Sequence, residues 1–167
     1  MDQTKKSHRV KTLPANSPTS LRTDRVITMK TENAFGPHLM LDLHKCDRKI
    51  LVDKEKMRSL LSNLPGQIGM TRISEPHVMT YKDKWAETPG VTGFVILAES
   101  HISLHTFPDD DYVFLDIFSC RNFDYESVKG FLVRFFGSQS PKTHLVERGE
   151  EFHKRPAIPK VKEKIIV

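Results

Sequence analysis

The hydrophobic pattern between residues 37 and 149 changes repeatedly between a short and a long period. Where apolar residues alternate with polar ones, or run together for a few positions, the pattern is typical of β-strands. Six segments of this kind are 37–46, 70–81, 91–99, 101–107, 111–120 and 143–147. The sequence therefore predicts a domain in which strands predominate.

Two segments between these strands carry apolar residues at the three- and four-residue spacing of amphipathic helices. The first helix is expected to begin after Asp53, a predicted N-cap, and to end at residues 65–66, a Pro-Gly pair. The second is expected to begin after Asp124 and to end at Gly137. The predicted buried stripes are Met57, Leu60, Leu61 and Leu64 in the first helix, and Val128, Phe131, Leu132 and Phe135 in the second.

One sheet with two helices makes an α+β fold, a two-layer α/β sandwich with a mainly antiparallel sheet. We expect both helices to cover the same face, because right-handed crossover connections place them there. Segments 94–98 and 112–118 are nevertheless apolar at odd and even positions alike, a pattern typical of strands buried on both faces. The second face needs a cover, so we expect a homodimer in which two copies pack sheet to sheet.

The formal net charge of +5 is concentrated at the ends of the chain. Residues 1–34 contain 7 Lys and Arg against 3 Asp and Glu, residues 150–167 contain 5 against 3, and residues 35–149 contain 14 against 15. Nucleic-acid binding requires a basic stripe on the folded surface, so this class of function is disfavoured. The composition predicts a disordered polar and basic extension over 1–34, one domain over 35–149 and a C-terminal tail over 150–167.

The chain has the features of a cytoplasmic protein. It contains two cysteines and no CxxC motif, which is typical of a reducing compartment. Its first residues lack the apolar stretch of a secretory signal. No apolar run approaches the roughly 20 residues that span a bilayer, so we expect no membrane partner.

The stretch AESHISLHTFP, residues 98–108, places a serine and two histidines where one predicted strand ends and the next begins. Ser100 could simply cap the turn between them. A serine hydrolase is disfavoured, because the chain lacks the G-x-S-x-G turn between a strand and a helix. A metal site at His101 and His105 is also disfavoured, because four residues along a strand separate them by about 13 Å.

A further possibility is that Ser100 acts on its own chain. Attack of its Oγ on the carbonyl carbon of Glu99 would give an ester, and β-elimination would then release residues 1–99. Hydrolysis of the remaining dehydroalanine would leave a pyruvoyl group, an electron sink comparable to pyridoxal phosphate. This chemistry needs a serine at a strained break, a nearby acid or base and a donor for the oxyanion. It needs no metal and no pyridoxal phosphate.

The residues around Ser100 resemble those of the prokaryotic-type S-adenosylmethionine decarboxylases, which are made as proenzymes and depend on a pyruvoyl group. The resemblance rests on ESHISLHTFP, residues 99–108, and on a cysteine twenty residues after the serine in FLDIFSC. GPHL (36–39) and KCDRK (45–49) also resemble that family's first strand and the turn after it. The similarity covers about 35–149, nearly the whole predicted domain.

The resemblance implies a role for each of five residues. Cleavage would occur between Glu99 and Ser100, and Ser100 would become the pyruvoyl group that forms a Schiff base with the substrate. His105 would be the acid and base of self-processing, with support from Thr92. Cys120 would return a proton to the decarboxylated carbon, and Glu99 would lie near the substrate. Without the resemblance, His105 is also consistent with a half-buried structural histidine, and Cys120 with a small core residue.

The implied activity is decarboxylation of S-adenosylmethionine, which supplies the aminopropyl donor for spermidine and other polyamines. Phe107 would stack on the substrate and Asp109 would bind the ribose hydroxyls, where the family more often has Trp and Glu. Trp85 could supply a second aromatic face or pack at the dimer rim. The expected partners are this small-molecule substrate and a second cleaved copy of the chain.

Two other functions remain open from the sequence. Because pyruvoyl chemistry is indifferent to the side chain of the amino acid, the acidic run 109–111 could instead select arginine or ornithine. Such a run is also typical of a solvated turn. A non-catalytic regulatory paralogue is disfavoured, because the residues required for catalysis are all present: Glu99, Ser100, His105 and Cys120.

Overall fold

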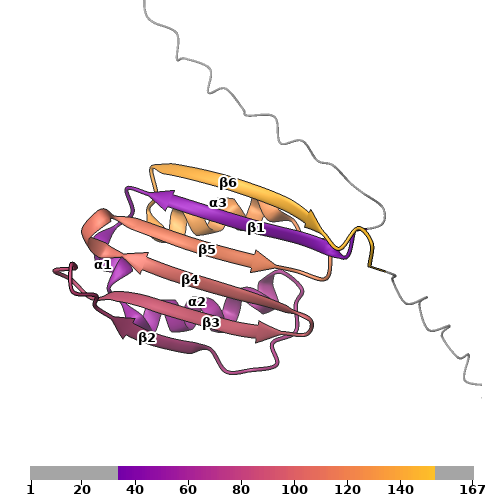
Figure 1. Ribbon diagram of the computed structural model, residues 1–167, viewed down its shortest axis with the longest axis horizontal. Coiled ribbons are helices and arrows are strands. Elements are labelled where there is room, and N and C mark those ends of the chain that lie inside the picture. Colours follow the sequence, from indigo (N-terminus) through magenta and orange to yellow (C-terminus); the bar gives the residue numbers. More distant parts are fainter. Residues whose placement is uncertain (1–33, 153–167) are drawn as a thin grey trace, which may run out of the picture.

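The computed structural model describes residues 34–152, which form one six-stranded sheet and three α-helices (Figure 1). In chain order the elements are β1 (Gly36–His44), α1 (Arg48–Leu51), α2 (Lys54–Gln67), β2 (His77–Tyr81), β3 (Gly90–Leu97), β4 (Ser100–Phe107), a 3₁₀ turn (Pro108–Asp110), β5 (Tyr112–Phe118), α3 (Tyr125–Phe136) and β6 (Ser140–Arg148). The strand order is β2-β3-β4-β5-β1-β6, and every neighbouring pair is antiparallel. The predicted α+β fold with an antiparallel sheet is confirmed.

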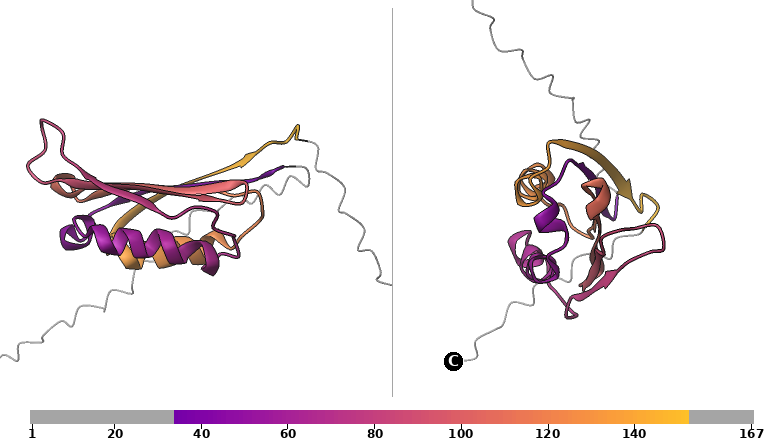
Figure 2. Two further views of the ribbon diagram at one scale, coloured as in Figure 1. Left: turned by 90° about the horizontal axis from the view of Figure 1, so that it is seen from below. Right: turned by 90° about the vertical axis from the view of Figure 1, so that its left-hand side faces the viewer.

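The two long helices, α2 and α3, lie on the same face of the sheet, as predicted (Figure 2). Their ends follow the predicted caps. The Asp53 carboxylate accepts a hydrogen bond from the Lys56 backbone N–H (3.0 Å), and the Asp124 carboxylate accepts one from Ser127 (3.0 Å). Helix α3 ends at Gly137, whose φ of 65° is one that glycine adopts without strain.

The hydrophobic core lies between the sheet and these helices. Alternate residues of each central strand point into it, so that Leu39, Leu41 and Leu43 of β1 are fully buried. The helices cover them with Met57, Leu61, Leu64, Leu132 and Phe136. Burial of one such side chain contributes about 1.5–3 kcal/mol. This layer fixes the strands that carry the candidate site.

The other face of the sheet exposes large apolar side chains. Phe94 is 40% exposed, Ile96 45% and Phe114 43%, and these residues lie on β3 and β5, on either side of β4. Large apolar side chains gathered on one exposed face indicate an interaction site. The homodimer packed sheet to sheet stays a prediction.

The segment before β2 differs from its prediction. The strand expected over 70–81 begins only at His77, directly after Pro76, because proline cannot donate to a strand ladder. Residues 71–74 instead make irregular hydrogen bonds with the end of β3. This contact positions the turn that follows β3.

The end of α2 and the short helix α1 differ from the sequence prediction, and the two ends of the chain lie mostly outside the described residues. Helix α2 passes through Pro65, its predicted end, and stops two residues later at Gln67; Pro65 lacks the N–H that would bond to the carbonyl one turn earlier, so the helix does not continue far beyond it. Helix α1 is a single turn, too short to show a hydrophobic period. The predicted extension over 1–34 and tail over 150–167 lie mostly outside the described residues. No helix within 34–152 is long and apolar enough to cross a membrane.

Candidate active site

The turn between β3 and β4 contains a strained residue. Leu97 and Ser100 are paired across the two strands, so Ala98 and Glu99 form a two-residue turn. Glu99 has a φ of 63°, a left-handed value at a position where such a turn usually has glycine. A non-glycine residue held there costs about 1–3 kcal/mol. The predicted cleavage site, the bond from Glu99 to Ser100, therefore directly follows a strained residue.

Hydrogen bonds from two other segments hold this turn. Ala98 donates its N–H to Thr71 O (2.8 Å), and its carbonyl O accepts from the Cys120 thiol (3.4 Å). The Cys120 backbone N–H donates to Ser100 Oγ (2.9 Å). Ser100 is 7% exposed, so its hydroxyl is held in a confined position. The structure thus brings Ser100 and Cys120 together at the predicted cleavage site.

His105 lies on the other face of β4 from Ser100. Side chains at even positions of this strand are buried, whereas His105 is exposed. Five residues of a strand span about 16 Å, and an odd spacing reverses the face. The His105 ring instead shares a hydrogen bond between its Nδ1 and Thr92 Oγ1 on β3 (3.2 Å). Within one chain, the structure does not bring His105 or Thr92 to Ser100.

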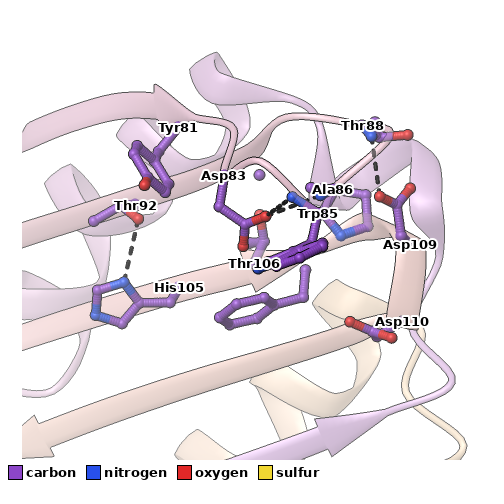
Figure 3. A pocket seen from close by; sticks show the side chains of 13 residues that line it. Tyr81, Asp83, Trp85, Ala86, Thr88, Thr92, His105, Thr106, Asp109 and Asp110 are labelled. Atoms are coloured by element: carbon purple, nitrogen blue, oxygen red, sulfur yellow. Dashed lines mark hydrogen bonds between the residues drawn. The ribbon is translucent and has the colours of Figure 1, made fainter.

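Thr92 and His105 line a pocket of about 390 Å³ at the opposite end of the β3–β4 hairpin (Figure 3). Pockets of roughly 300–1,000 Å³ bind small molecules. Phe107, which is 41% exposed, contributes an aromatic ring to this pocket, and the loop over 82–89 contributes Trp85, which is 82% exposed. The pocket therefore combines the predicted processing histidine with the predicted aromatic contacts.

Asp109 fixes the loop over 82–89 to this end of the sheet. Its carboxylate accepts hydrogen bonds from the backbone N–H groups of Glu87 (2.7 Å) and Thr88 (3.0 Å), and from the Arg48 guanidinium. The pKa of the Asp109 carboxyl is lowered from its ordinary value, mainly by the hydrogen bonds from Thr88. The charge of Arg48 lowers this pKa further. Both oxygens are occupied within the chain, and the predicted contact with a ribose stays a prediction.

The predicted site residues thus form two groups at opposite ends of the β3–β4 hairpin. The cleavage end consists of Glu99, Ser100 and Cys120, and the pocket end consists of Thr92, His105, Phe107 and Asp109.

Sequence reasoning missed two residues that support these ends. Arg48 binds Asp109 at the pocket end and also donates to the Thr88 hydroxyl (2.6 Å). It lies within the KCDRK motif, so the resemblance contained a signal for it. Thr71 acts at the cleavage end through its backbone carbonyl, which leaves no trace in a side-chain pattern.

Comparison with known proteins gives a consistent result. Residues 37–149 match the protein family described as S-adenosylmethionine decarboxylase. The S-adenosylmethionine decarboxylase proenzymes of Synechococcus sp. and Methanococcus aeolicus are 36% identical over 85 residues and 38% identical over 86 residues. These alignments cover 51% and 52% of this chain, and 62% and 68% of the relatives. The chain therefore matches less than two thirds of the length of the Synechococcus protein.

A solved structure agrees with the fold. The crystal structure of the adenosylmethionine decarboxylase from Aquifex aeolicus has a TM-score of 0.60 and 25% sequence identity to this chain, and the match covers 70% of this chain and 92% of that one. The family match over 37–149 includes both ends of the hairpin and nearly all of the described residues. The chain belongs to the S-adenosylmethionine decarboxylase family.

Proposed function

We propose that this protein is a cytoplasmic, self-cleaving decarboxylase that depends on a pyruvoyl group and acts on S-adenosylmethionine in polyamine synthesis. The observation that carries the proposal is the hydrogen bond from the Cys120 N–H to Ser100 Oγ, at a turn where Glu99 is strained. The names of the relatives support both the substrate and the proenzyme form.

Self-cleavage uses atoms that lie at this turn. Ser100 Oγ loses its proton and bonds to the carbonyl carbon of Glu99, whose bond to the Ser100 nitrogen breaks to leave an ester. Loss of the Ser100 α-proton then breaks the Cβ–Oγ bond, and the oxygen leaves as part of the new Glu99 carboxylate. Water converts the remaining dehydroalanine into the pyruvoyl group and releases ammonia. Strain at Glu99 favours the first step, and the Cys120 N–H stabilises charge on Oγ.

The residues at the cleavage end fit the group that this reaction leaves at position 100. The pyruvoyl carbonyl supplies an electron sink for the loss of carbon dioxide from a bound amino acid. The Cys120 thiol is partly exposed and lies 3.4 Å from Ala98 O, so it is the acid within reach of the product carbon. The new Glu99 carboxylate is expected to lie beside the substrate.

A second copy of the chain completes the site in this proposal. The cleavage end and the pocket end of one hairpin lie about 16 Å apart. A two-fold axis that lies between the two open faces and perpendicular to the strands reverses the direction of the hairpin, so it sets each cleavage end against a pocket end of the partner and creates two equal sites. The partner's His105, supported by Thr92, then serves as the acid and base of self-cleavage. The same pairing covers the exposed apolar side chains of β3 and β5.

The pocket end favours S-adenosylmethionine over arginine or ornithine. Phe107 and Trp85 offer aromatic faces to a purine and to a sulfonium cation. Asp109, one of the acids of the run 109–111 that could pair with a cationic amino acid, is already bound by Arg48 and by backbone N–H groups.

Mass analysis and a decarboxylation assay test this function. The purified protein should consist of two chains that meet between Glu99 and Ser100, and the second chain should lack a free amino terminus. It should release labelled carbon dioxide from S-adenosylmethionine and not from arginine or ornithine. Ser100→Ala should remain one chain. A folded wild-type protein that is never cleaved would refute the proposal.

Co-expression of two inactive variants tests the shared site. A mixed dimer of Ser100→Ala and His105→Ala has one site with both residues intact. The His105→Ala chain should therefore be cleaved in the mixture and remain whole when expressed alone. If mixing restores no cleavage, the site is not shared between copies.

A further inference from the structure

Ser119, the residue between β5 and Cys120, is buried, and its hydroxyl makes two hydrogen bonds. Ser119 has no solvent exposure. Its Oγ donates to Arg121 O (2.6 Å) and accepts from the Arg121 backbone N–H (3.0 Å), while its own N–H donates to Pro37 O (3.0 Å). These contacts close a tight loop around the one residue between Ser119 and Arg121, which is Cys120.

The peptide unit that joins Ser119 to Cys120 is confined at both of its polar atoms. A Cβ on Gly36 would lie 2.0 Å from Ser119 O, so only glycine lets β1 approach this closely. On the other side, the Cys120 N–H points at Ser100 Oγ (2.9 Å) and the thiol points at Ala98 O (3.4 Å). Both contacts with the cleavage turn depend on the orientation of this small loop.

We propose that Ser119 is a positioning residue for self-cleavage, an inference that rests on the cleavage between Glu99 and Ser100 proposed above. Its hydroxyl keeps the Cys120 N–H directed at Ser100 Oγ. That oxygen carries negative charge as it loses its proton, and negative charge develops on it again as it leaves Ser100 Cβ within the new carboxylate. A donor that is fixed beforehand stabilises such charge without reorganisation.

The Ser119 hydroxyl affects the rate of cleavage more than the fold. Loss of one fixed donor to an oxygen on which negative charge develops, here Oγ in the elimination, slows a reaction by about 10²–10³-fold. Ser119→Ala keeps the Cys120 N–H and removes only the contact that directs it, so the expected loss is smaller, about tenfold. The groups that lose a partner are the backbone N–H and carbonyl O of Arg121, whose hydrogen bonds to Ser119 are only partly buried.

A time course of self-cleavage in the full-length chain, made by cell-free synthesis, tests this inference. Ser119→Ala is expected to cleave about tenfold more slowly than the wild type, and Ser119→Thr, which keeps the hydroxyl, is expected to recover most of the rate. Ser138→Ala is the matched control, because the Ser138 hydroxyl donates to His44 O (2.8 Å) at the other end of β1. This control should cleave at the wild-type rate.

The outcomes separate the two proposals. If folded Ser119→Ala cleaves at the wild-type rate, the role of Ser119 is overturned and self-cleavage stands. If Ser119→Ala does not fold, Ser119→Thr and Ser119→Val replace it, because they differ only in a hydroxyl against a methyl group. A slower Val variant supports the inference, and equal rates overturn it. A folded wild-type chain that is never cleaved overturns both proposals.

Discussion

Replacing Glu99 with glycine should slow self-cleavage and stabilise the uncleaved protein. Glycine adopts a φ near the observed 63° without the clash that costs other residues about 1–2 kcal/mol. The strain is present in the folded precursor and is released as the peptide bond breaks, so its removal lowers the energy of the starting state alone. The rate of cleavage should therefore fall about 5–30-fold.

The expected gain in folding stability is smaller than the strain. Glycine loses more backbone entropy on folding than other residues, which costs about 0.5–1 kcal/mol, so the net stabilisation is about 0–1.5 kcal/mol. For a folded domain of this size, that raises the Tm by about 6 °C at most. The measurement needs a Ser100→Ala background, in which the chain stays intact, and it compares thermal unfolding with and without Glu99→Gly.

Lys45→Gly is the matched control for this experiment. Lys45 lies directly after β1, is exposed and has a similar φ of 54°. Its replacement should give a comparable gain in Tm and leave the rate of cleavage unchanged. If Glu99→Gly raises the Tm but cleaves at the wild-type rate, strain at the turn does not assist the reaction.

Three further predictions concern turnover, substrate binding and pH. Cys120→Ala should still cleave but lose about 10²–10⁴-fold in carbon dioxide release per cleaved chain, because it lacks the proton donor. Phe107→Ala should raise the KM for S-adenosylmethionine in steady-state assays and leave cleavage unchanged. The hydrogen bonds that lower the pKa of Asp109 are favourable above the ordinary carboxyl pKa of about 4 and are lost as the pH falls through the lowered value. Acid should therefore release the loop over 82–89, and the fluorescence of Trp85, the single tryptophan, should change. Asp109→Ala should show the released signal at pH 7.

Each of these three predictions would be contradicted by one specific result. Full turnover in Cys120→Ala removes the thiol from the mechanism, and an unchanged KM in Phe107→Ala removes the ring from the binding site. Trp85 emission that is the same in the wild type and in Asp109→Ala at pH 7 shows that Asp109 does not hold the loop.

Most of the fold follows from signals that are local in the sequence. Asp53, Asp124 and Gly137 mark helix ends through contacts with residues close by in the chain. The strands alternate between the core and the open face one residue at a time. Residues 71–74 escape this reasoning, because hydrogen bonds with β3, much later in the chain, decide their position.

The residues of the candidate site are easier to predict than their arrangement. Ser100 and Cys120 meet because β4 and β5 are antiparallel neighbours with His101 opposite Phe118, so their wide spacing in sequence closes across the sheet. The strand geometry that separates His101 from His105 also separates Ser100 from His105, by about 16 Å and onto opposite faces. A motif does not specify whether its residues meet within one chain or between two.

The size of each contribution to the rate of self-cleavage indicates which one a single chain lacks. Strain of about 1–2 kcal/mol at Glu99 accelerates bond breaking by about 30-fold at most, and the fixed Cys120 N–H adds about 10²–10³-fold to the elimination that follows. An acid and base such as His105 contributes about 10²–10⁴-fold, and it is the contribution that a chain cannot deliver to its own turn. A precursor that has folded but not paired should therefore keep the bond before Ser100 intact. If two copies pair as proposed, pairing of the two open sheet faces starts cleavage and also buries the apolar surface that the folded chain leaves exposed.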